Sequence, residues 1–297
     1  MMNVLIIANP MSGKKKTKII LDTIVLKTLV TNNISYKIHL TEFPLHAREL
    51  INKVPLKNYN FILVLGGDGT MHEVIDGMLD RDDDSNIPIG LLATGSGNSL
   101  LHDRGNTNID TSLQKILKYK ITNIDVLKVK TPENIFYSLN LVGWGMVNDI
   151  SVRAENNRWM GPMRYNISSL IEIFQCHPKY VDFEIDGNSY KGKYTFIIAC
   201  NTKHVGKGMK MAPNAKLNDG KMDLIIIKDN FKKIKLLKMF PKIFNGSHIH
   251  DKIVNYKQAK EIKIIPKSHS TINIDGEIKG KTPISIKVLP GKIKLLN

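Results

Sequence analysis

Asp68 is well placed to do chemistry, because glycines surround it. It lies in the run Gly66-Gly67-Asp68-Gly69-Thr70, directly after the apolar segment 61–65. Glycines can adopt unusual backbone dihedrals and let a ligand reach the backbone amides, and a helix that starts here presents unpaired N–H groups, which suits a phosphate. A carboxylate beside bound phosphates is repelled unless it acts on a metal ion or on a proton. Asp68 therefore indicates phosphate chemistry rather than phosphate storage.

The elements around Asp68 are predicted to be a buried strand and a helix. Residues 61–65 are apolar and stop at paired glycines, which is typical of a strand that enters a tight turn. Apolar residues then recur at helical spacing at positions 71, 74, 75, 78 and 79. The glycines 66, 67 and 69 are thus expected in a strand-to-helix loop.

Three similar units occur in the first half of the chain. Residues 4–8 predict a strand, residues 9–16 a small basic turn, and residues 17–29 a helix, although the turn lacks the spacing of a Walker A loop and could be an ordinary turn. Residues 36–40 predict a strand before a helix that begins near 46. Residues 87–92 predict a strand that ends in the loop 93–99. Such alternation implies a parallel sheet with its ligand crevice at the carboxyl ends of the strands.

The pattern of apolar and polar residues changes from about Asp125 onward. Two helices, near 163–174 and 231–240, interrupt a series of short alternating segments that predict an antiparallel β domain. We expect a nucleotide-binding α/β domain at 1–125, a β-sandwich domain at 126–297 and a ligand cleft between them. The predicted strands are 124–130, 136–142, 180–186, 194–200, 222–227, 261–265, 271–275 and 284–288.

Composition limits the compartment and the partners. Cys176 and Cys200 offer no disulfide framework, no apolar run approaches the length of a membrane span, and the first residues lack a signal peptide pattern, so a cytoplasmic setting is expected. The formal net charge of +16 favours an anionic partner, for which nucleic acid, an acidic membrane surface and a polyphosphate cofactor all qualify. Lysines scattered by compositional drift would give the same charge.

The motifs together resemble the diacylglycerol kinase catalytic family, and within it most closely the sphingosine kinases. Gly-Gly-Asp-Gly-Thr alone is shared with NAD kinases, but the ordered set, which runs through nearly the whole chain, is specific. Its pieces are Asn9-Pro10 with Ser12-Gly13-Lys14, Thr41-Glu42 with residues 46–50, residues 66–70 with His72-Glu73-Val74, Gly95-Ser96-Gly97-Asn98, Gly143-Trp144-Gly145 with Asp149 and Arg158, Met163-Arg164-Tyr165, Met211-Ala212-Pro213 with residues 218–223, and Ile274-Asp275-Gly276-Glu277.

The resemblance implies an ATP- and Mg²⁺-dependent kinase that phosphorylates the primary hydroxyl of a lipid. Asp68 matches the family's catalytic carboxylate, as proton acceptor or as a Mg²⁺ ligand through water, and Glu277 is a rival for the base. By the same resemblance, Asp125 would belong to the network of water molecules around the metal ion. The positions implied for the nucleotide are Asn9, Ser12, Thr41, Gly66, Gly67, Gly69, Thr70, Glu73, Gly95, Ser96, Gly97, Asn98, Arg158, Arg164 and Asp275.

Several of these positions also have ordinary structural explanations. Asp275-Gly276 alone is typical of a hairpin turn, Arg158 and Arg164 of solvated helix residues, and Glu73 of the polar face of its helix. Only their match to the motifs of the family favours a functional role for these residues.

The lipid head group is the point at which the chain departs from its relatives. The resemblance favours a sphingoid base, with diacylglycerol or ceramide as alternatives. Sphingosine kinases usually carry an acid at the position of Ser151, where a sphingoid ammonium needs a carboxylate, and Ser99 follows the sphingosine-kinase pattern. Asp149 and Glu155 are the candidates to replace the missing acid, so Asp149, Ser151 and Glu155 are the expected substrate residues.

Membrane contact and competing functions complete the expectations. The predicted helix 231–240 combines apolar residues with lysines, so it either docks on an anionic membrane or packs on the β domain.

NAD kinase and a non-catalytic lipid- or nucleic-acid-binding protein are the competing functional classes. No pattern of RNA-binding type is evident, so no nucleic-acid partner is expected. The oligomeric state is open, with a homodimer as one possibility.

Overall fold

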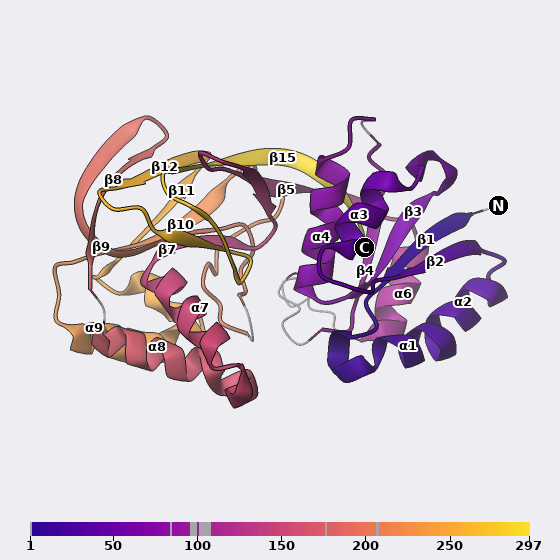
Figure 1. The fold of residues 1–297 in the computed structure, drawn as a ribbon, viewed down its shortest axis with the longest axis horizontal. Coiled ribbons are helices and arrows are strands. Elements are labelled where there is room, and N and C mark those ends of the chain that lie inside the picture. The colour runs from indigo at the N-terminus through magenta and orange to yellow at the C-terminus, as the bar shows by residue number, and fades with distance from the viewer. Residues whose placement is uncertain (1, 84, 96–99, 101–107, 176, 206–207) are drawn as a thin grey trace. The chain divides into compact units, whose positions relative to one another are not determined.

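The chain forms two compact units, which are described separately (Figure 1). The structure is a computed structural model that describes residues 2–83, 85–95, 100, 108–175, 177–205 and 208–297. The first unit comprises Met1–Ile124 with Gly291–Asn297, and the second comprises Asp125–Pro290. The C-terminal segment joins the first unit because Leu295 pairs in parallel with Ile89.

A parallel sheet forms the centre of the first unit. Its strands run in the order β15-β4-β3-β1-β2. Helices cover both faces of such a sheet, and the strands β1, β3 and β4 are accordingly buried almost throughout. The bounds are β1 Asn3–Ala8, β2 Ser35–Leu40, β3 Phe61–Gly66, β4 Ile89–Ala93 and β15 Ile284–Leu296.

The helices of the first unit lie on the two sides of this sheet. Figure 1 shows α1, α2 and α6 on one side and α3 and α4 on the other. The predicted helix 17–29 consists of three segments, because a π-helical turn interrupts it. The bounds are η1 Ser12–Lys15, α1 Thr17–Ile20, η2 Leu21–Val25, α2 Leu26–Thr31, α3 His46–Lys53, η3 Leu56–Asn58, α4 Asp68–Leu79 and α6 Ile109–Leu117.

The second unit is an antiparallel β-sandwich. Its main path is β14-β13-β7-β9-β8-β12-β15, while β10 joins β9 to β11 and β5 joins β15 to β6. A large apolar core that includes Trp144, Phe183 and Ile262 lies between the strands. The bounds are β5 Ile121–Lys130, β6 Ile135–Ser138, β7 Leu141–Gly145, β8 Lys179–Ile185, β9 Asn188–Cys200, β10 Met222–Lys228, β11 Val254–Ala259, β12 Glu261–Pro266, β13 Thr271–Ile274 and β14 Glu277–Lys281.

Helices cover one outer face of this sandwich. Along β9, Ile197 and Ala199 belong to the inner core, whereas Phe196 and Ile198 belong to a second core shared with the helices. This alternation explains why residues 196–200 of the strand are apolar at every position. The helices are α7 Met146–Asn156, η4 Arg158–Met163, α8 Arg164–Gln175, α9 Lys233–Met239, η5 Phe240–Ile243 and η6 Ser247–His250.

The predicted fold class, an α/β domain with a parallel sheet followed by an antiparallel β-sandwich, is confirmed. Of the two interpretations of residues 231–240, packing on the β domain describes α9, because Leu236 and Met239 are buried in the second core. Among the described residues, no helix is long and apolar enough to span a membrane.

Candidate active site

Asp68 begins a helix immediately after a buried strand. It is the first residue of α4, and only Gly67 separates it from the end of β3. The turn is therefore tighter than predicted, since Gly66 closes the strand and Gly69 lies in the first turn of the helix. The early N–H groups of a helix have no partners within it, so backbone donors and the positive end of the α4 dipole are found beside the carboxylate.

Gly66 and Gly67 are required for close approach rather than for positive φ angles. Gly66, Gly67 and Gly69 do not have positive φ angles. A Cβ atom on Gly67 would lie 3.2 Å from the Cα of Gly95, and one on Gly66 would lie 2.5 Å from the side chain of Thr70. These glycines therefore do not use the positive φ angles that glycine allows, while the backbone is close-packed where the strand meets the helix.

Hydrogen bonds tie together the loops that follow β1, β3 and β4. The Asn9 side-chain amide donates to the Thr70 hydroxyl at 3.1 Å, and the Thr94 amide donates to the Gly66 carbonyl at 2.8 Å. The hydroxyls of Thr17 and Thr94 lie 2.7 Å apart in a buried pair. All of these loops leave the carboxyl ends of parallel strands, which is where an open α/β sheet binds its ligand.

Gly13 fits tightly into this set of loops. It has a φ of +60°, and a Cβ atom there would lie 2.0 Å from the Thr94 carbonyl oxygen. Ser12 lies beside it, with its hydroxyl 3.8 Å from the position of a Gly67 Cβ atom. A side chain larger than hydrogen at residue 13 would therefore push the loop after β1 away from the loop after β4.

The other predicted positions of the first unit lie at or near the same edge. Thr41, at the end of β2, is buried and donates its amide to the Ala8 carbonyl at 2.9 Å. Ser96, Gly97 and Asn98 lie outside the described residues. The structure brings together Asn9, Ser12, Thr41, Gly66, Gly67, Asp68, Gly69, Thr70 and Gly95.

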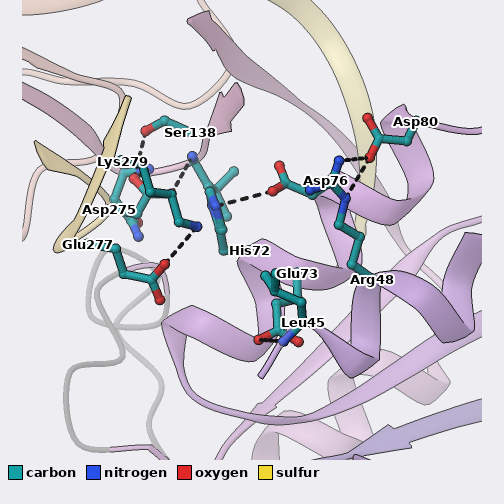
Figure 2. A network of polar contacts seen from close by, with 12 residues as sticks. Leu45, Arg48, His72, Glu73, Asp76, Asp80, Ser138, Asp275, Glu277 and Lys279 are labelled. Atoms are coloured by element: carbon teal, nitrogen blue, oxygen red, sulfur yellow. Dashed lines mark hydrogen bonds and ion pairs between the residues drawn. The ribbon is translucent and has the colours of Figure 1, made fainter. Parts of the chain in front are cut away.

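Glu73 holds the start of a neighbouring helix. Its two carboxylate oxygens accept hydrogen bonds from the amides of Leu45 and Ala47, at 3.1 and 3.2 Å (Figure 2). A carboxylate at a helix N-terminus is stabilised by the helix dipole. Glu73 therefore positions α3 and the loop before it, and its predicted contact with the nucleotide stays a prediction.

In the second unit, Asp275 forms the hairpin turn that its sequence also allowed. Asp275 and Gly276 have φ angles of 51° and 92° between the paired residues Ile274 and Glu277. This pattern is typical of a two-residue type I′ turn.

The Asp275 carboxylate accepts at least four hydrogen bonds. The donors are the Ser138 hydroxyl at 2.6 Å and the amides of Leu139, Asn140 and Leu141, each at 2.9 Å (Figure 2). Asp186 forms a similar turn, since it has a φ of 46° and precedes Gly187. Its carboxylate accepts hydrogen bonds from the amides of Lys260 and Glu261. These bonds give Asp275 a structural role, and its contact with the nucleotide stays a prediction.

Glu277 and Arg164, two charged positions predicted in the second unit, are engaged in ion pairs. Glu277 is exposed and lies 2.7 Å from the ammonium of Lys279 (Figure 2). Arg164, at the start of α8, lies 3.2 Å from the Glu155 carboxylate. Arg158 begins η4, and its side chain lies outside the described residues.

The predicted substrate residues also have partners within the chain. The Lys179 ammonium contacts both Asp149 oxygens, at 3.2 and 3.1 Å. Ser151 is buried and accepts a hydrogen bond from the Asn273 amide at 2.8 Å. Lys179 was missed by the sequence analysis, because thirty residues of chain separate it from Asp149 and no local pattern connects the two.

Asp125 is buried at the start of the second unit. It accepts a hydrogen bond from the Gly220 amide at 2.7 Å, so it holds the loop that contains Gly220. Within the described part of the chain, no group of three or more His, Cys, Asp or Glu side chains is placed to hold a metal ion. Mg²⁺ in phosphotransferases commonly uses one or two carboxylates with substrate phosphates and water, a requirement that Asp68 can meet.

A buried carboxyl group in the second unit was not predicted as a site. Burial raises the pKa of Asp223, and the hydroxyl of Tyr256 donates to it at 2.6 Å. Burial and the bond to Asp223 likewise raise the pKa of Tyr256. The pair links β10 to β11 beneath the helices, which indicates a structural role.

The predicted site residues therefore form two sets. The first surrounds Asp68 in the first unit, and the second comprises positions in the second unit whose partners lie within that unit. The prediction that both sets converge on one nucleotide stays a prediction.

Comparison with known proteins gives the family. Residues 3–129 match the model of the diacylglycerol kinase catalytic domain, and residues 140–297 match that of the YegS C-terminal NAD kinase beta sandwich-like domain. Sphingosine kinase 1 of Arabidopsis thaliana is 28% identical over 95% of this chain and 70% of its own length. A diacylglycerol kinase of Bacillus subtilis is 26% identical over 94% of this chain and 90% of its own.

A solved structure agrees with the fold. The crystal structure of a diacylglycerol kinase from Bacillus anthracis covers 99% of this chain and 96% of its own, with a TM-score of 0.74 and 20% identity. Both domain models lie on this chain in the order found here, the first on the α/β part and the second on the β-sandwich. The chain belongs to the lipid kinase family that includes the diacylglycerol kinases and the sphingosine kinases.

Proposed function

We propose that this lipid kinase transfers the γ-phosphoryl group of ATP to the primary hydroxyl of a lipid with an uncharged head group, of the diacylglycerol class. The observation that carries the catalytic part is Asp68, a carboxylate at the first position of α4 within a close-packed glycine turn. In the reaction, the lipid oxygen bonds to the γ-phosphorus as the bond to the β,γ-bridging oxygen breaks. The hydroxyl proton passes to the Asp68 carboxylate.

The residues around Asp68 have a positioning task in this reaction. Phosphoryl transfer depends mainly on alignment and on stabilisation of negative charge. The α4 N-terminus supplies backbone donors, and the bond between Asn9 and Thr70 fixes the first loop against that helix. ATP would supply the phosphoryl group, Mg²⁺ would neutralise its charge, and Asp68 is the residue of the first unit proposed to hold the ion. The place of Asp125 in the network of metal ion and water stays a prediction.

The head-group proposal rests on the ion pairs of the second unit. Asp149 contacts Lys179 and Glu155 contacts Arg164, so both acids that could replace the acid missing at position 151 already pair with cations of the chain. A sphingoid ammonium would have to displace one of them, whereas an uncharged glycerol hydroxyl would not. A sphingoid base is the second candidate, supported by the similarity to a sphingosine kinase.

The head-group proposal predicts a change in preference when Lys179 is replaced. Wild type should phosphorylate diacylglycerol with a higher kcat/KM than sphingosine. Lys179→Met leaves Asp149 without this cation, so the ratio of sphingosine to diacylglycerol kcat/KM should rise about three- to tenfold, a modest change because the pair is partly exposed. The assay follows label from γ-labelled ATP into each purified lipid.

A matched control is Lys263→Met, which removes a similar ion pair with Glu184 on β12 and β8. The control should leave the ratio unchanged. A wild-type preference for sphingosine would overturn the head-group proposal and leave lipid kinase activity intact, whereas no labelled lipid of either class would overturn the proposed reaction.

The close packing of Gly13 predicts a specific loss of ATP affinity. In Gly13→Ala, the new Cβ atom would clash with the Thr94 carbonyl, so the loops must separate and the KM for ATP should rise about 10- to 100-fold. Steady-state kinetics at varied ATP concentrations measure this. Gly187→Ala is the control, because Gly187 also has a positive φ but open space around its Cβ position. An equal KM in the two variants would contradict the proposed role of the loops.

The working location is part of the same proposal. A water-soluble nucleotide and a bilayer-resident substrate require an enzyme that contacts the membrane surface. The net charge of +16 supports peripheral association with an anionic, cytoplasmic membrane face. The predicted docking helix is packed inward as α9, so the contact surface must be sought elsewhere.

A further inference from the structure

The hairpin formed by β13 and β14 is fixed by contacts at its turn and along one strand. The Asp275 carboxylate ties the turn to the segment between β6 and β7. On β13, the Asn273 side-chain amide donates to the Ser151 hydroxyl of α7 at 2.8 Å. The Asn148 side chain, also on α7, donates to the Thr271 hydroxyl at 3.0 Å. These contacts hold the hairpin in one position within the second unit.

A β-bulge interrupts the second strand of this hairpin. Asn273 of β13 pairs with Ile278 of β14, whereas Thr271 pairs with Lys281. Two steps along β13 therefore match three steps along β14, and the extra residue lies within 279–280. A β-bulge redirects side chains, and bulges are frequent beside active sites.

Gly280 is the residue that allows this bulge. It has a φ of +68°, a conformation that favours glycine. A Cβ atom on Gly280 would lie 2.9 Å from the side chains of Phe136 and Thr131, so the backbone is packed closely there. The bulge thus sets the direction of Lys279, the residue before Gly280.

Lys279 directs its ammonium group at Glu277. The ammonium nitrogen lies 2.7 Å from a Glu277 carboxylate oxygen (Figure 2). The Lys279 side chain is 19% exposed, whereas that of Glu277 is 55% exposed. An ammonium group is strongly hydrated, so its partial removal from water costs free energy. The chain therefore holds a cation away from bulk water beside a predicted catalytic carboxylate.

Stability explains little of this arrangement. The ion pair spans two residues of one strand, so it connects no separate elements. The pair of Lys263 with Glu184, by contrast, links β12 to β8. A partly exposed ion pair contributes little to the free energy of unfolding. A role in the reaction is the better explanation for a lysine on a bulge beside Glu277.

Phosphoryl transfer requires positive charge at the γ-phosphoryl oxygens. Among the predicted nucleotide positions, Arg164 already pairs with Glu155. As a candidate base, Glu277 would have to lie beside the hydroxyl that attacks the γ-phosphorus. The Lys279 ammonium would then be close to the γ-phosphoryl group, and lysine binds phosphate well as a compact charge.

We propose that Lys279 binds the γ-phosphoryl group of ATP. Its ammonium pairs with Glu277 in the structure and moves to a γ-phosphate oxygen when the nucleotide binds. The motifs shared with the family end at Glu277, so the resemblance assigns no role to Lys279. The inference rests on the proposed function, because it takes ATP as the phosphoryl donor.

Nucleotide binding tests this contact without the lipid. Isothermal titration calorimetry with Mg²⁺ compares ADP with AMP-PNP, an ATP analogue whose β,γ-imido bridge resists cleavage. Lys279→Gln removes the charge and keeps most of the side chain. It should weaken AMP-PNP binding about 10- to 100-fold, the effect of one lost hydrogen bond between charged groups, and ADP binding less than about threefold. A change that only disturbed the fold would weaken both alike.

Two further variants provide the controls. Lys279→Arg keeps the positive charge and should restore the affinity for AMP-PNP to within about fivefold of wild type. Lys281→Gln removes an exposed lysine two residues further along β14 and should leave both affinities within about twofold. Thermal unfolding of each variant, recorded in parallel, measures any loss of stability.

The outcomes separate this inference from the proposed reaction. An equal loss of affinity for AMP-PNP and ADP in Lys279→Gln would overturn the γ-phosphoryl contact. So would a lower kcat with unchanged AMP-PNP affinity, because Lys279 would then act only by positioning Glu277. Wild type that binds neither nucleotide would overturn the proposed function together with the inference. The predicted loss in Lys279→Gln, with no labelled lipid formed by wild type, would support the contact and overturn the proposed lipid acceptor.

Discussion

Replacing Asp68 by asparagine is expected to lower the rate of lipid phosphorylation about 10²- to 10⁴-fold while the chain stays folded. Asparagine has the same shape but cannot accept the hydroxyl proton, and positioned proton transfer contributes a factor of this size. Loss of a negative charge at the α4 N-terminus should cost under about 1 kcal/mol of stability. The effect should therefore fall on kcat rather than on folding.

The measurement is the initial rate of label transfer from γ-labelled ATP to diacylglycerol, with thermal unfolding recorded in parallel. Asp82→Asn is the matched control, since Asp82 is an exposed carboxylate shortly after the end of α4. Its rate should equal that of wild type. A rate for Asp68→Asn within about threefold of wild type would exclude Asp68 as the proton acceptor and leave Glu277 as the candidate to examine.

Replacing Asp275 by asparagine is expected to destabilise the second unit by about 3 kcal/mol. The Ser138 hydroxyl and the amides of Asn140 and Leu141 donate to one carboxylate oxygen, and the Leu139 amide donates to the other. Asparagine keeps one acceptor oxygen but loses the charge, and its NH₂ group faces at least one of these donors. Hydrogen bonds to a charged group contribute about 1.5–3 kcal/mol each, and amides left without a partner add to the loss. The melting temperature should fall by about 6–12 °C for a unit of this size.

Calorimetry of the whole chain measures this change. Asp182→Asn is the control, because Asp182 is an exposed carboxylate on β8 in the same unit. It should unfold within about 1–2 °C of wild type. An unchanged melting temperature for Asp275→Asn, combined with a large rise in the KM for ATP, would instead make Asp275 a nucleotide ligand.

Local sequence patterns predicted the elements around Asp68 well, because each depends on neighbours in the chain. The apolar run before Gly66 is a strand, and the helical spacing after Asp68 is a helix. The glycine turn was located correctly, but the packing contact that requires Gly67 was not predicted. Gly67 is needed because Gly95 approaches it from another loop, and no single stretch of sequence contains that contact.

Long-range contacts explain most of what the sequence did not predict. The predicted strand 136–142 is two strands, since residues 139–141 turn their amides toward Asp275 far along the chain. Lys179 neutralises Asp149 from another element, and the last residues of β15 return to the first unit beside β4. These features depend on tertiary packing rather than on periodicity.

The orientation of α8 is a related case. The sequence predicts a helix near 163–174, and its periodicity marks one apolar side, which would ordinarily be assigned to the core. Arg153 reverses that assignment, because it binds Glu172 and draws the polar side inward. Knowledge of the partner on α7 is therefore required to identify the exposed side.

The most direct test of the central claim is one reaction in which the purified chain meets γ-labelled ATP, Mg²⁺, NAD and vesicles that contain diacylglycerol. Organic extraction and chromatography then separate labelled lipid, labelled nucleotide and free phosphate. The proposed function predicts that label enters the lipid at its primary hydroxyl, and that it does so far faster than it enters NAD or water. Label in NAD or in free phosphate, with none in the lipid, would contradict it.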